Sequence, residues 1–356
     1  MTRKRIQFVL SLLVTVVCLW WAFRGVELRK LWEDLRQINY WWLIPFCAVT
    51  FLSMYFRAMR WKYLLEPIVD IPSHKVFPPL IICFALNGML PGRAGEFARA
   101  YLVSRDYRAR FSSALATVVV ERIADGVGLL AMLVVIFAVV PLNDQLSVQF
   151  KNITIDAATL RTLVNRLLVV CVVLLAGTIL MLWGPFRRLV QTIIVRLPLL
   201  PHKIKERIAH FIETFVHGFH SLRSPRIIFW VVFHTLTVWL TVGWSLSLMS
   251  RGFSDLHISF SQGMATAIII CIAIMIPAAP GYWGLYEVGC ILSLKMLGVV
   301  PLDDAGHALA LSYSLIVHTF QLVCTIGPGL FFLWRRHVGL SELTHAEPPE
   351  NSPPNS

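Results

Sequence analysis

The apolar runs of this chain constrain its fold most, because several are long enough to cross a lipid bilayer. Runs of about 18 or more mostly apolar residues are typical of membrane-spanning helices. Four such runs are clear: Ile6–Phe23, Leu163–Trp183, Ile227–Met249 and Ala308–Trp334. Two further runs, Trp41–Phe56 and Ala114–Val140, are interrupted or carry charges, which need an explanation but do not exclude a span. The sequence therefore predicts an all-α polytopic membrane protein with about six full transmembrane helices.

The composition excludes an ordinary soluble domain. Of 356 residues, 57% are hydrophobic and 15% are charged, whereas soluble domains carry about 25% charged residues. The first apolar run follows three basic residues, as in a signal peptide, but it ends in Trp20-Trp21-Ala22-Phe23 without a small-residue cleavage site. We therefore expect this run to be an uncleaved membrane anchor.

Basic residues are distributed unevenly between alternate loops. Lys and Arg number 22 in one set of segments and seven in the other. The first set comprises residues 1–5, 57–76, 93–110, 184–227 and 335–336, and the second comprises 24–40, 141–162 and 251–260. By the positive-inside rule the first set is cytoplasmic, which predicts a multi-pass protein of the bacterial inner membrane with both termini inside. The net charge of +12 is thus a topology signal, and no nucleic-acid partner is predicted.

Three segments outside the long apolar runs have a distinct composition. Residues 26–38 place leucines on one helical face and charges on the other, which predicts an external interfacial helix. Residues 203–222 repeat this pattern and form either an interfacial helix or a packed connector. The end of the chain is polar and rich in proline, as in disordered tails. We therefore divide the chain into a transmembrane domain, residues 1–340, and a disordered cytoplasmic tail, residues 341–356.

One apolar run is too short to cross the bilayer. Phe77–Leu90 has 14 residues, which make a helix of about 21 Å against a hydrocarbon core of about 30 Å. It ends at Pro91-Gly92 and is followed by a second short run, Gly95–Arg105. Two short helices on either side of a Pro-Gly break are typical of a re-entrant hairpin.

A second pair of short runs repeats this arrangement. Gly263–Ile276 also has 14 residues, ends near Pro280-Gly281 and is followed by Gly284–Leu297. Three predicted spans separate the two hairpins, so that the hairpins enter from opposite faces of the membrane. Such an inverted repeat of broken helices indicates the midplane site of a transporter, although two chance breaks in ordinary packed helices are the alternative. The predicted hairpin breaks are Pro91, Gly92, Gly95, Pro280, Gly281 and Gly284.

Charges beside the first break indicate a site for an anionic headgroup. The helix that begins near Ala94 directs free N–H groups and its positive dipole end into the membrane. Arg93 lies next to this helix start, and an arginine can bind a phosphate with two hydrogen bonds. The alternative is that Arg93 and Arg99 are loop charges at the cytoplasmic surface.

The third predicted span contains three charged residues, each of which is costly to bury in a bilayer. Glu121 and Asp125 share a helix face, and Arg122 can pair with Asp125. That pair leaves Glu121 in need of a partner, which could be Arg93, Arg99 or a substrate amine. Because local pairing does not require Glu121, we expect the Glu121→Gln protein to fold.

The remaining polar residues of the apolar runs are expected either to bind substrate at the second break or to join helices. Glu287 lies beside the second break and is a further candidate site residue. His234, His318 and Gln321 lie in the last two predicted spans, where contacts between helices are their expected role. No spacing of residues is typical of a metal site, a nucleotide site or an activated nucleophile. The sequence therefore predicts no catalytic residue, no metal and no cofactor.

Four motifs occur in the order of a known family: Arg57–Trp61, Asn87–Arg99, Glu121–Asp125 and Pro280–Glu287. Together they resemble the lysylphosphatidylglycerol synthase transmembrane-region family of flippase-like bacterial and archaeal membrane proteins, over roughly residues 5–335. The resemblance implies translocation of a lipid, either an aminoacylated or other phospholipid or a polyprenyl-linked sugar. Bifunctional members add a soluble aminoacyl-transferase domain. About 20 residues follow the last run here, and we therefore expect no synthase activity.

The predicted function is that of an inner-membrane lipid flippase or transporter. Its expected partner is a membrane lipid with an anionic headgroup or a linked sugar. One alternative is a membrane-embedded transferase that uses Glu121 or Asp125 as a base, and another is a non-transporting scaffold for lipid-synthesis enzymes. The predicted substrate-binding residues are Arg93, Glu96, Arg99, Glu121, Arg122, Asp125 and Glu287.

Overall fold

The structure is a computed structural model, which describes residues 3–90, 93–139, 147–150, 153–156, 224–276 and 279–336, with isolated positions between 162 and 192. Apart from those isolated positions, the predicted span Leu163–Trp183 lies outside this part of the chain. The predicted helix 203–222, the predicted tail 341–356 and the break residues Pro91 and Gly92 also lie outside it.

The described residues form helices and one short sheet. The helices before the sheet are α1 (Arg3–Phe23), α2 (Leu28–Gln37), η1 (Tyr40–Trp42), α3 (Leu43–Leu65), α4 (Ser73–Met89), α5 (Ala94–Tyr107) and α6 (Phe111–Val139). The helices after it are α10 (Pro225–Ser250), α11 (Phe260–Ala273), η4 (Pro280–Tyr282), α12 (Leu285–Met296) and α13 (Asp304–Arg335).

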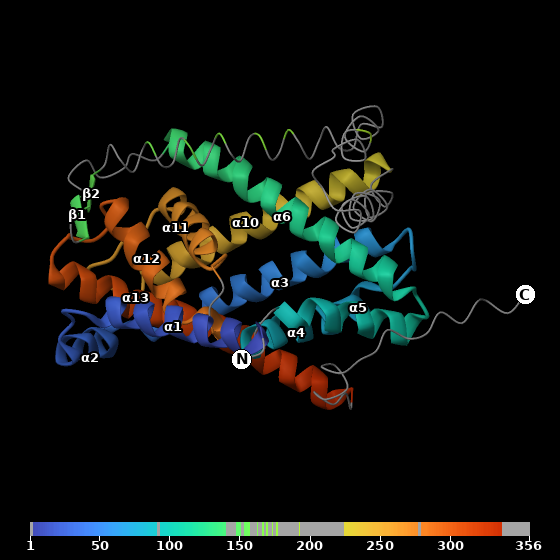
Figure 1. The fold of residues 1–356 in the computed structure, drawn as a ribbon, viewed down its shortest axis with the longest axis horizontal. Coiled ribbons are helices and arrows are strands. Elements are labelled where there is room, and N and C mark those ends of the chain that lie inside the picture. The colour runs from blue at the N-terminus through green and yellow to red at the C-terminus, as the bar shows by residue number, and fades with distance from the viewer. Residues whose placement is uncertain are drawn as a thin grey trace, which may run out of the picture.

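Three helices run along the longest dimension of the molecule, α3, α10 and α13 (Figure 1). With η1 included in the first, each is long and apolar enough to cross a membrane, and α1 and α2, which are bent by 80°, pass the same test together. The three correspond to the spans predicted at Trp41–Phe56, Ile227–Met249 and Ala308–Trp334. They confirm a multi-pass helical membrane protein. Helix α6 is 29 residues long and carries the buried charges described below.

Helix α3 differs from its prediction at its C-terminal end. It continues to Leu65, nine residues beyond Phe56, so residues 57–65 are helical and not a loop, while the cytoplasmic placement of 57–76 stays a prediction. Arg60 is fully buried in this extension and forms ion pairs with carboxylates of α6. Because its charge is neutralised by another helix, the apolar helix can continue through it.

The helix predicted within residues 26–38 is confirmed as α2. Leu31 is buried, and the Ser312 hydroxyl of α13 donates to Asp34 over 3.4 Å, so one face of α2 packs on α13. Leu28 and Trp32 on another part of the helix are exposed. Contact of that exposed part with the membrane interface stays a prediction.

The first predicted hairpin consists of α4 and α5. Helix α4 begins at Ser73, four residues earlier than predicted, and its 17 residues span about 26 Å, still less than the hydrocarbon core. Gly95 brings α5 against α4, since a Cβ atom at Gly95 would lie 2.0 Å from the carbonyl oxygen of Cys83. The Gly95 N–H also donates to Asn87 Oδ1 over 3.0 Å. The helical hairpin is therefore confirmed, while its re-entry into a membrane is not tested.

The second hairpin consists of α11, η4 and α12. A capping box of Ser259 and Gln262 starts α11. Gly281 and Gly284 have φ angles of 76° and 87°, a conformation that favours glycine, and they form the turn into α12. Helix α12 returns along α11, where Gly289 lies close to the backbone of Ile270.

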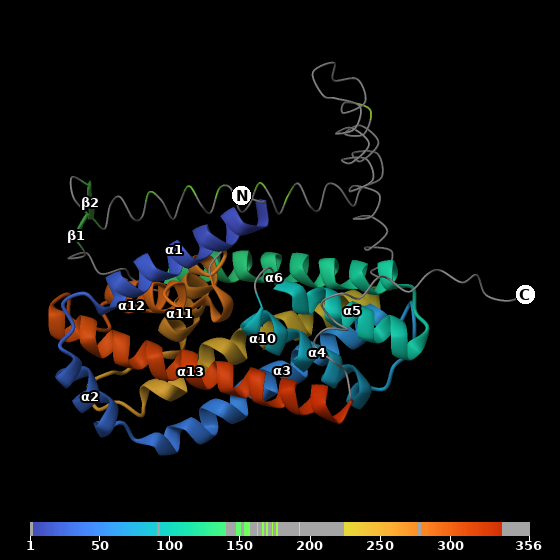
Figure 2. The ribbon, with the colours of Figure 1, turned by 60° about the horizontal axis from the view of Figure 1, so that its bottom comes forward.

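The tips of the two hairpins meet. A Cβ atom at Gly281, in the second break, would lie 3.5 Å from the carbonyl oxygen of Gly88, one residue before the end of α4. Figures 1 and 2 both show the α4–α5 hairpin and the α11–α12 hairpin toward opposite ends of the long axis. Helix α1 covers the second tip, since the Ala279 N–H donates to Thr15 Oγ1 over 3.0 Å. The hairpins therefore approach each other from opposite ends of the helix bundle.

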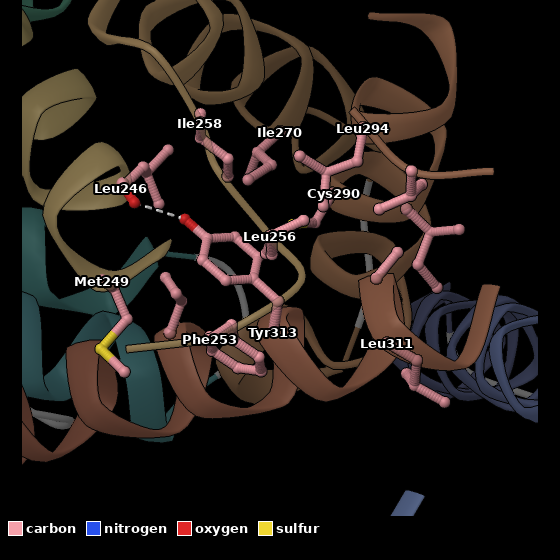
Figure 3. Packing of buried hydrophobic residues seen from close by; sticks show 14 of the residues in the cluster. Leu246, Met249, Phe253, Leu256, Ile258, Ile270, Cys290, Leu294, Leu311 and Tyr313 are labelled. Atoms are coloured by element: carbon pink, nitrogen blue, oxygen red, sulfur yellow. Dashed lines mark hydrogen bonds between the residues drawn. The ribbon is translucent and has the colours of Figure 1, made fainter. Parts of the chain in front are cut away.

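A buried aromatic cluster joins α10 and α13 (Figure 3). The Tyr313 hydroxyl donates to the carbonyl oxygen of Leu246 over 2.7 Å. Phe253 lies edge-on to the Tyr313 ring with centroids 5.6 Å apart. Met249 and Leu256 belong to the same buried cluster. The cluster fixes the turn after α10 that leads into the second hairpin.

A two-stranded antiparallel sheet lies in the segment predicted to be an external loop. It consists of β1 (Ser147–Phe150) and β2 (Ile153–Asp156), with Ser147 opposite Asp156. The sequence analysis did not predict it, although Val148 and Phe150 alternate with polar residues in the manner of a strand.

We expect Gly95→Ala to destabilise the protein, because the added methyl group meets the backbone carbonyl of Cys83. Overpacking of this kind typically costs about 1–3 kcal/mol. Gly126→Ala is the matched control, since a Cβ atom at Gly126 has nothing within 4 Å and alanine favours the helix. The measurement is the thermal unfolding temperature in detergent. Equal unfolding temperatures for the two variants would contradict the described contact between α4 and α5.

Candidate functional site

A cluster of buried charges joins three helices. Arg60 comes from α3, Arg99 from α5, and Glu121, Arg122 and Asp125 from α6. The side chains of Arg60, Arg99 and Glu121 are fully buried, and that of Arg122 is 32% exposed. Helix α6 presents both carboxylates to α3, because Glu121 and Asp125 are one helical turn apart.

Glu121 is at the centre of this cluster. Its Oε2 lies 2.9 Å from Arg99 Nη1, and its Oε1 lies 2.6 Å from Arg122 Nη2 and 3.3 Å from Arg60 Nη2. Of the partners that the sequence allowed for Glu121, Arg99 is confirmed. Arg60 was missed because α3 was predicted to end before it. The prediction that pairing does not require Glu121 is wrong, since three arginines converge on this carboxylate.

Asp125 pairs with two of the same arginines. Arg60 Nη1 lies 2.5 Å from Asp125 Oδ1, and it also donates to Thr235 Oγ1 of α10 over 3.0 Å. Arg122 Nη1 lies 3.4 Å from Asp125 Oδ2, which confirms the predicted pair within α6. Arg60 therefore connects α3 to both α6 and α10.

The α5 side of the cluster is equally well anchored. Arg122 Nε lies 3.5 Å from Glu96 Oε1, so Glu96, which was predicted only as a substrate-binding residue, lies at the edge of the cluster. The Arg99 guanidinium lies 4.8 Å from the centroid of the Trp61 ring, and Trp61 Nε1 donates to Thr117 Oγ1 over 3.0 Å. The alternative in which Arg99 is a surface loop charge is therefore wrong, because its side chain is fully buried.

Arg57 is a functional candidate that the sequence analysis placed in a loop. It lies one turn before Arg60 on α3, and its guanidinium is 5.4 Å from the centroid of the Phe84 ring. Its Nε is buried and has no hydrogen-bond partner within the described part of the chain. With Arg57 and Glu96 included, four arginines face only three carboxylates, which leaves one positive charge in excess. The excess positive charge therefore favours an anion next to Arg57.

Arg57 lines a cavity between α3, α10, α11, α12 and α13. The cavity holds about 80 Å³, room for a small polar group or a few water molecules and less than most small-ligand sites offer. Most of its wall is apolar, as in such sites generally. The polar side chains that line it are Thr50, Ser53, Arg57, Ser245, Tyr286 and Gln321.

Arg93 lies at the start of α5, as predicted. It is exposed, and it adopts a left-handed conformation with φ of 56° directly before the first residue of the helix. In the described part of the chain Arg93 forms no ion pair with the cluster, and it is not among the residues that line the cavity. Its contact with a headgroup stays a prediction.

Glu287 does not join the cluster, unlike the other predicted acidic residues. It is fully buried, its Oε1 lies 2.6 Å from His318 Nδ1 of α13, and its Oε2 accepts the Gly284 N–H over 2.6 Å. The expected role of His318 in a contact between helices is confirmed, as is that of Gln321, whose Oε1 accepts the Tyr286 hydroxyl over 3.1 Å. Among the described residues, no group of three or more His, Cys, Asp or Glu side chains could hold a metal ion.

Comparison with known proteins identifies one family and one curated relative. The family described as the lysylphosphatidylglycerol synthase TM region has a model that matches residues 8–329. A UPF0104 membrane protein of Methanothermobacter thermautotrophicus is 27% identical over 93 residues, which are 25% of this chain and 28% of that protein. The alignment thus covers less than a third of the length of this curated relative. No solved structure matches the chain with significance.

We expect Glu121→Gln to destabilise the protein strongly, since it leaves buried arginines without their shared counter-ion. Removing one partner of a buried pair typically costs about 3–5 kcal/mol. Glu96→Gln is the matched control, because Glu96 makes one longer contact at the edge of the cluster. Thermal unfolding and the monodisperse fraction on gel filtration are the measurements. A Glu121→Gln protein as stable as the Glu96→Gln protein would show that the cluster does not hold the three helices together.

Proposed function

This chain belongs to the lysylphosphatidylglycerol synthase TM region family, and from that premise we propose that it is a lipid flippase. In this proposal the helical domain, residues 1–340, carries a lipid between the two leaflets of the membrane. The proposed membrane is the bacterial cytoplasmic membrane, with both termini and the proposed disordered tail, residues 341–356, in the cytoplasm. The proposed membrane arrangement has six full spans and two re-entrant hairpins.

The observation that carries the proposal is the meeting of the two hairpin tips beside a cavity. Gly88 and Gly281 lie in contact range, and Tyr286 of the second hairpin lines the cavity. Inverted repeats of broken helices place transporter sites near the bilayer midplane. Hairpins that meet tip to tip provide two thin barriers, one toward each face, which can open alternately without unfolding a complete span.

The cavity suits a phosphate-bearing headgroup. Arg57 supplies a charge without an ion-pair partner within 4 Å in the described part of the chain, and the excess charge of the cluster adds to it. A guanidinium binds phosphate through two parallel hydrogen bonds. Ser53, Ser245 and Tyr286 supply hydroxyl groups around it. Arg93 is exposed at the start of α5, and in this proposal it is a second contact of the headgroup.

The buried cluster then has a positioning role. Arg60, Arg99, Glu121, Arg122 and Asp125 form ion pairs with one another, which neutralise most of their charge before a substrate binds. They fix α3 relative to α5 and α6, and Arg57 lies one turn away on α3. We therefore assign substrate contact to Arg57 and Arg93 and positioning to the cluster.

A membrane-embedded transferase that uses Glu121 or Asp125 as its base is the second candidate. A carboxylate that is paired with two or three arginines is a weak base, and both residues are paired in this way. A scaffold for lipid-synthesis enzymes is the third candidate, and it needs no uncompensated arginine in a cavity. The geometry therefore favours the transporter.

The opposite orientation of the two hairpins predicts a labelling pattern. A cysteine at position 108, just after α5, should react with a membrane-impermeant maleimide from the cytoplasmic face only. A cysteine at position 302, in the loop between α12 and α13, should react from the outer face only. The native cysteines are replaced by alanine in both proteins. Labelling of both positions from the same face contradicts the inverted arrangement.

Transport itself is tested in proteoliposomes with a fluorescent anionic phospholipid and dithionite as the impermeant quencher. We expect the wild-type protein to expose inner-leaflet lipid to the quencher and Arg57→Gln to slow this by roughly tenfold or more. The reason is the loss of a charge-assisted contact worth about 1.5–3 kcal/mol.

Arg226→Gln is the matched control, because Arg226 is an exposed arginine of α10 whose ion pair with Glu66 is at the surface. It should transport at the wild-type rate. If Arg57→Gln folds and moves lipid as fast as Arg226→Gln, the cavity is not the substrate site. If the wild-type protein moves no lipid in this assay, the flippase proposal itself fails.

A further inference from the structure

A buried histidine–glutamate pair lies at the second hairpin tip, apart from the arginine cluster. Glu287 is fully buried, the His318 side chain is 3% exposed, and His318 Nδ1 lies 2.6 Å from Glu287 Oε1. The other carboxylate oxygen accepts the N–H of Gly284, the residue before the first residue of α12. The lipid pathway proposed above does not use this pair.

The surroundings of the pair are aromatic and uncharged. The His318 ring stacks on Tyr286, with centroids 4.1 Å apart, and lies 4.5 Å from the Trp283 ring. The titratable groups nearest the pair are thiols and a phenol: Cys18 of α1, and Tyr286 and Cys290 of α12. Among the described residues, no lysine or arginine lies within 4 Å of Glu287. A change in the protonation of the pair is therefore not masked by a neighbouring cation in direct contact.

The pair can exist with and without one proton. A neutral imidazole next to the carboxylate leaves a net charge of −1, and one further proton makes an imidazolium–carboxylate pair with no net charge. The state with a net charge of −1 is stabilised by the Gly284 N–H and by the positive end of the α12 dipole. The imidazolium–carboxylate state has no net charge and so avoids an uncompensated charge in an apolar interior. Neither state is therefore excluded by burial.

The pair also contacts the cavity wall and the second hairpin tip, which packs on α1, and these parts move in the proposed alternating-access cycle. Tyr286, which stacks on His318, lines the cavity, and its hydroxyl donates to Gln321. Gly284, which is bound by Glu287, packs against the α1 backbone at Thr15. Gly281, three residues earlier, faces Gly88 of the first hairpin. A change of charge at Glu287 and His318 therefore acts where the cavity, α1 and the two tips come together.

We propose that Glu287 and His318 form a proton-binding site and that lipid movement is coupled to a transmembrane proton gradient. The inference rests on the proposed flippase function and supplies its energy source. In each cycle a proton from water on one face forms an N–H bond at the imidazole, and that bond breaks to release the proton to water on the other face. The lipid gains and loses no bond.

The first test asks whether the pair binds a proton, independently of lipid transport. Infrared difference spectra of the purified protein are recorded while the pH is changed between about 5 and 8, the range in which histidine usually titrates. We expect one part of the imidazole signal to accompany a shift of a carboxylate band, and His318→Gln and Glu287→Gln should each remove that part together with the carboxylate shift, leaving the signal of the other histidines. His234→Gln is the matched control, another buried histidine that packs among Tyr63, Trp230 and Phe233. A spectrum that all three variants leave unchanged overturns the proton site.

The second test asks whether the proton drives the lipid. Proteoliposomes with a fluorescent anionic phospholipid receive a pH gradient of about one unit at clamped membrane potential, which for one proton per lipid supports an asymmetry between leaflets of up to about tenfold. We expect this asymmetry in the wild-type and His234→Gln proteins, its collapse with a protonophore, and its absence in His318→Gln. If His318→Gln cannot be purified, Glu287→Gln and the protonophore comparison decide the question.

The outcomes separate the two proposals. Lipid that moves but reaches equal amounts in both leaflets under the gradient overturns the coupling and leaves the flippase proposal intact. Lipid that does not move under any condition overturns the flippase proposal and the coupling with it. In that case the infrared titration still decides whether Glu287 and His318 bind a proton.

Discussion

The convergence of three arginines on the buried carboxylate of Glu121 is the interaction on which the rest of the structure depends. Charged groups inside a membrane protein are tolerated only when they compensate one another, and here the compensation comes from three different helices. Because Arg60 is neutralised by α6, helix α3 continues past it to Leu65, and Arg57, one turn before Arg60, lies in the cavity wall. The pairing of Arg99 in turn holds α5, and with it the first hairpin tip, against α6.

Each hairpin contributes charged residues to a different group: the first to the ion-pair cluster and the second to the Glu287–His318 pair. The first hairpin contributes Arg99 and Glu96 to the ion-pair cluster. The second contributes Tyr286 to the cavity wall and Glu287 to a pair with His318. Contact between Gly88 and Gly281 joins the tips. In the proposed mechanism, substrate charge and proton charge therefore act on one shared contact.

Much of the fold followed from length and periodicity, because long apolar helices and glycine-rich breaks leave local signals. The spans at α10 and α13, helix α2, and both helical hairpins were predicted in this way. The extension of α3 was not, since Arg57 and Arg60 look like positive-inside loop charges until their tertiary partners are known. Likewise, the Arg99–Glu121 contact was foreseen only as one of three options, and Glu287 and His318 are 31 residues apart, so their pairing has no local signal.

In the proposed transporter, the hairpin tips meet at mid-depth in the membrane, next to a headgroup cavity. An experimental structure of the protein in lipid nanodiscs tests this most directly, because the bilayer density gives the depth of every helix. The account predicts Gly88 and Gly281 near the bilayer midplane, with lipid phosphate density beside Arg57. It is contradicted if α4 and α5 lie at one membrane surface, or if the cavity opens only to water and holds no lipid.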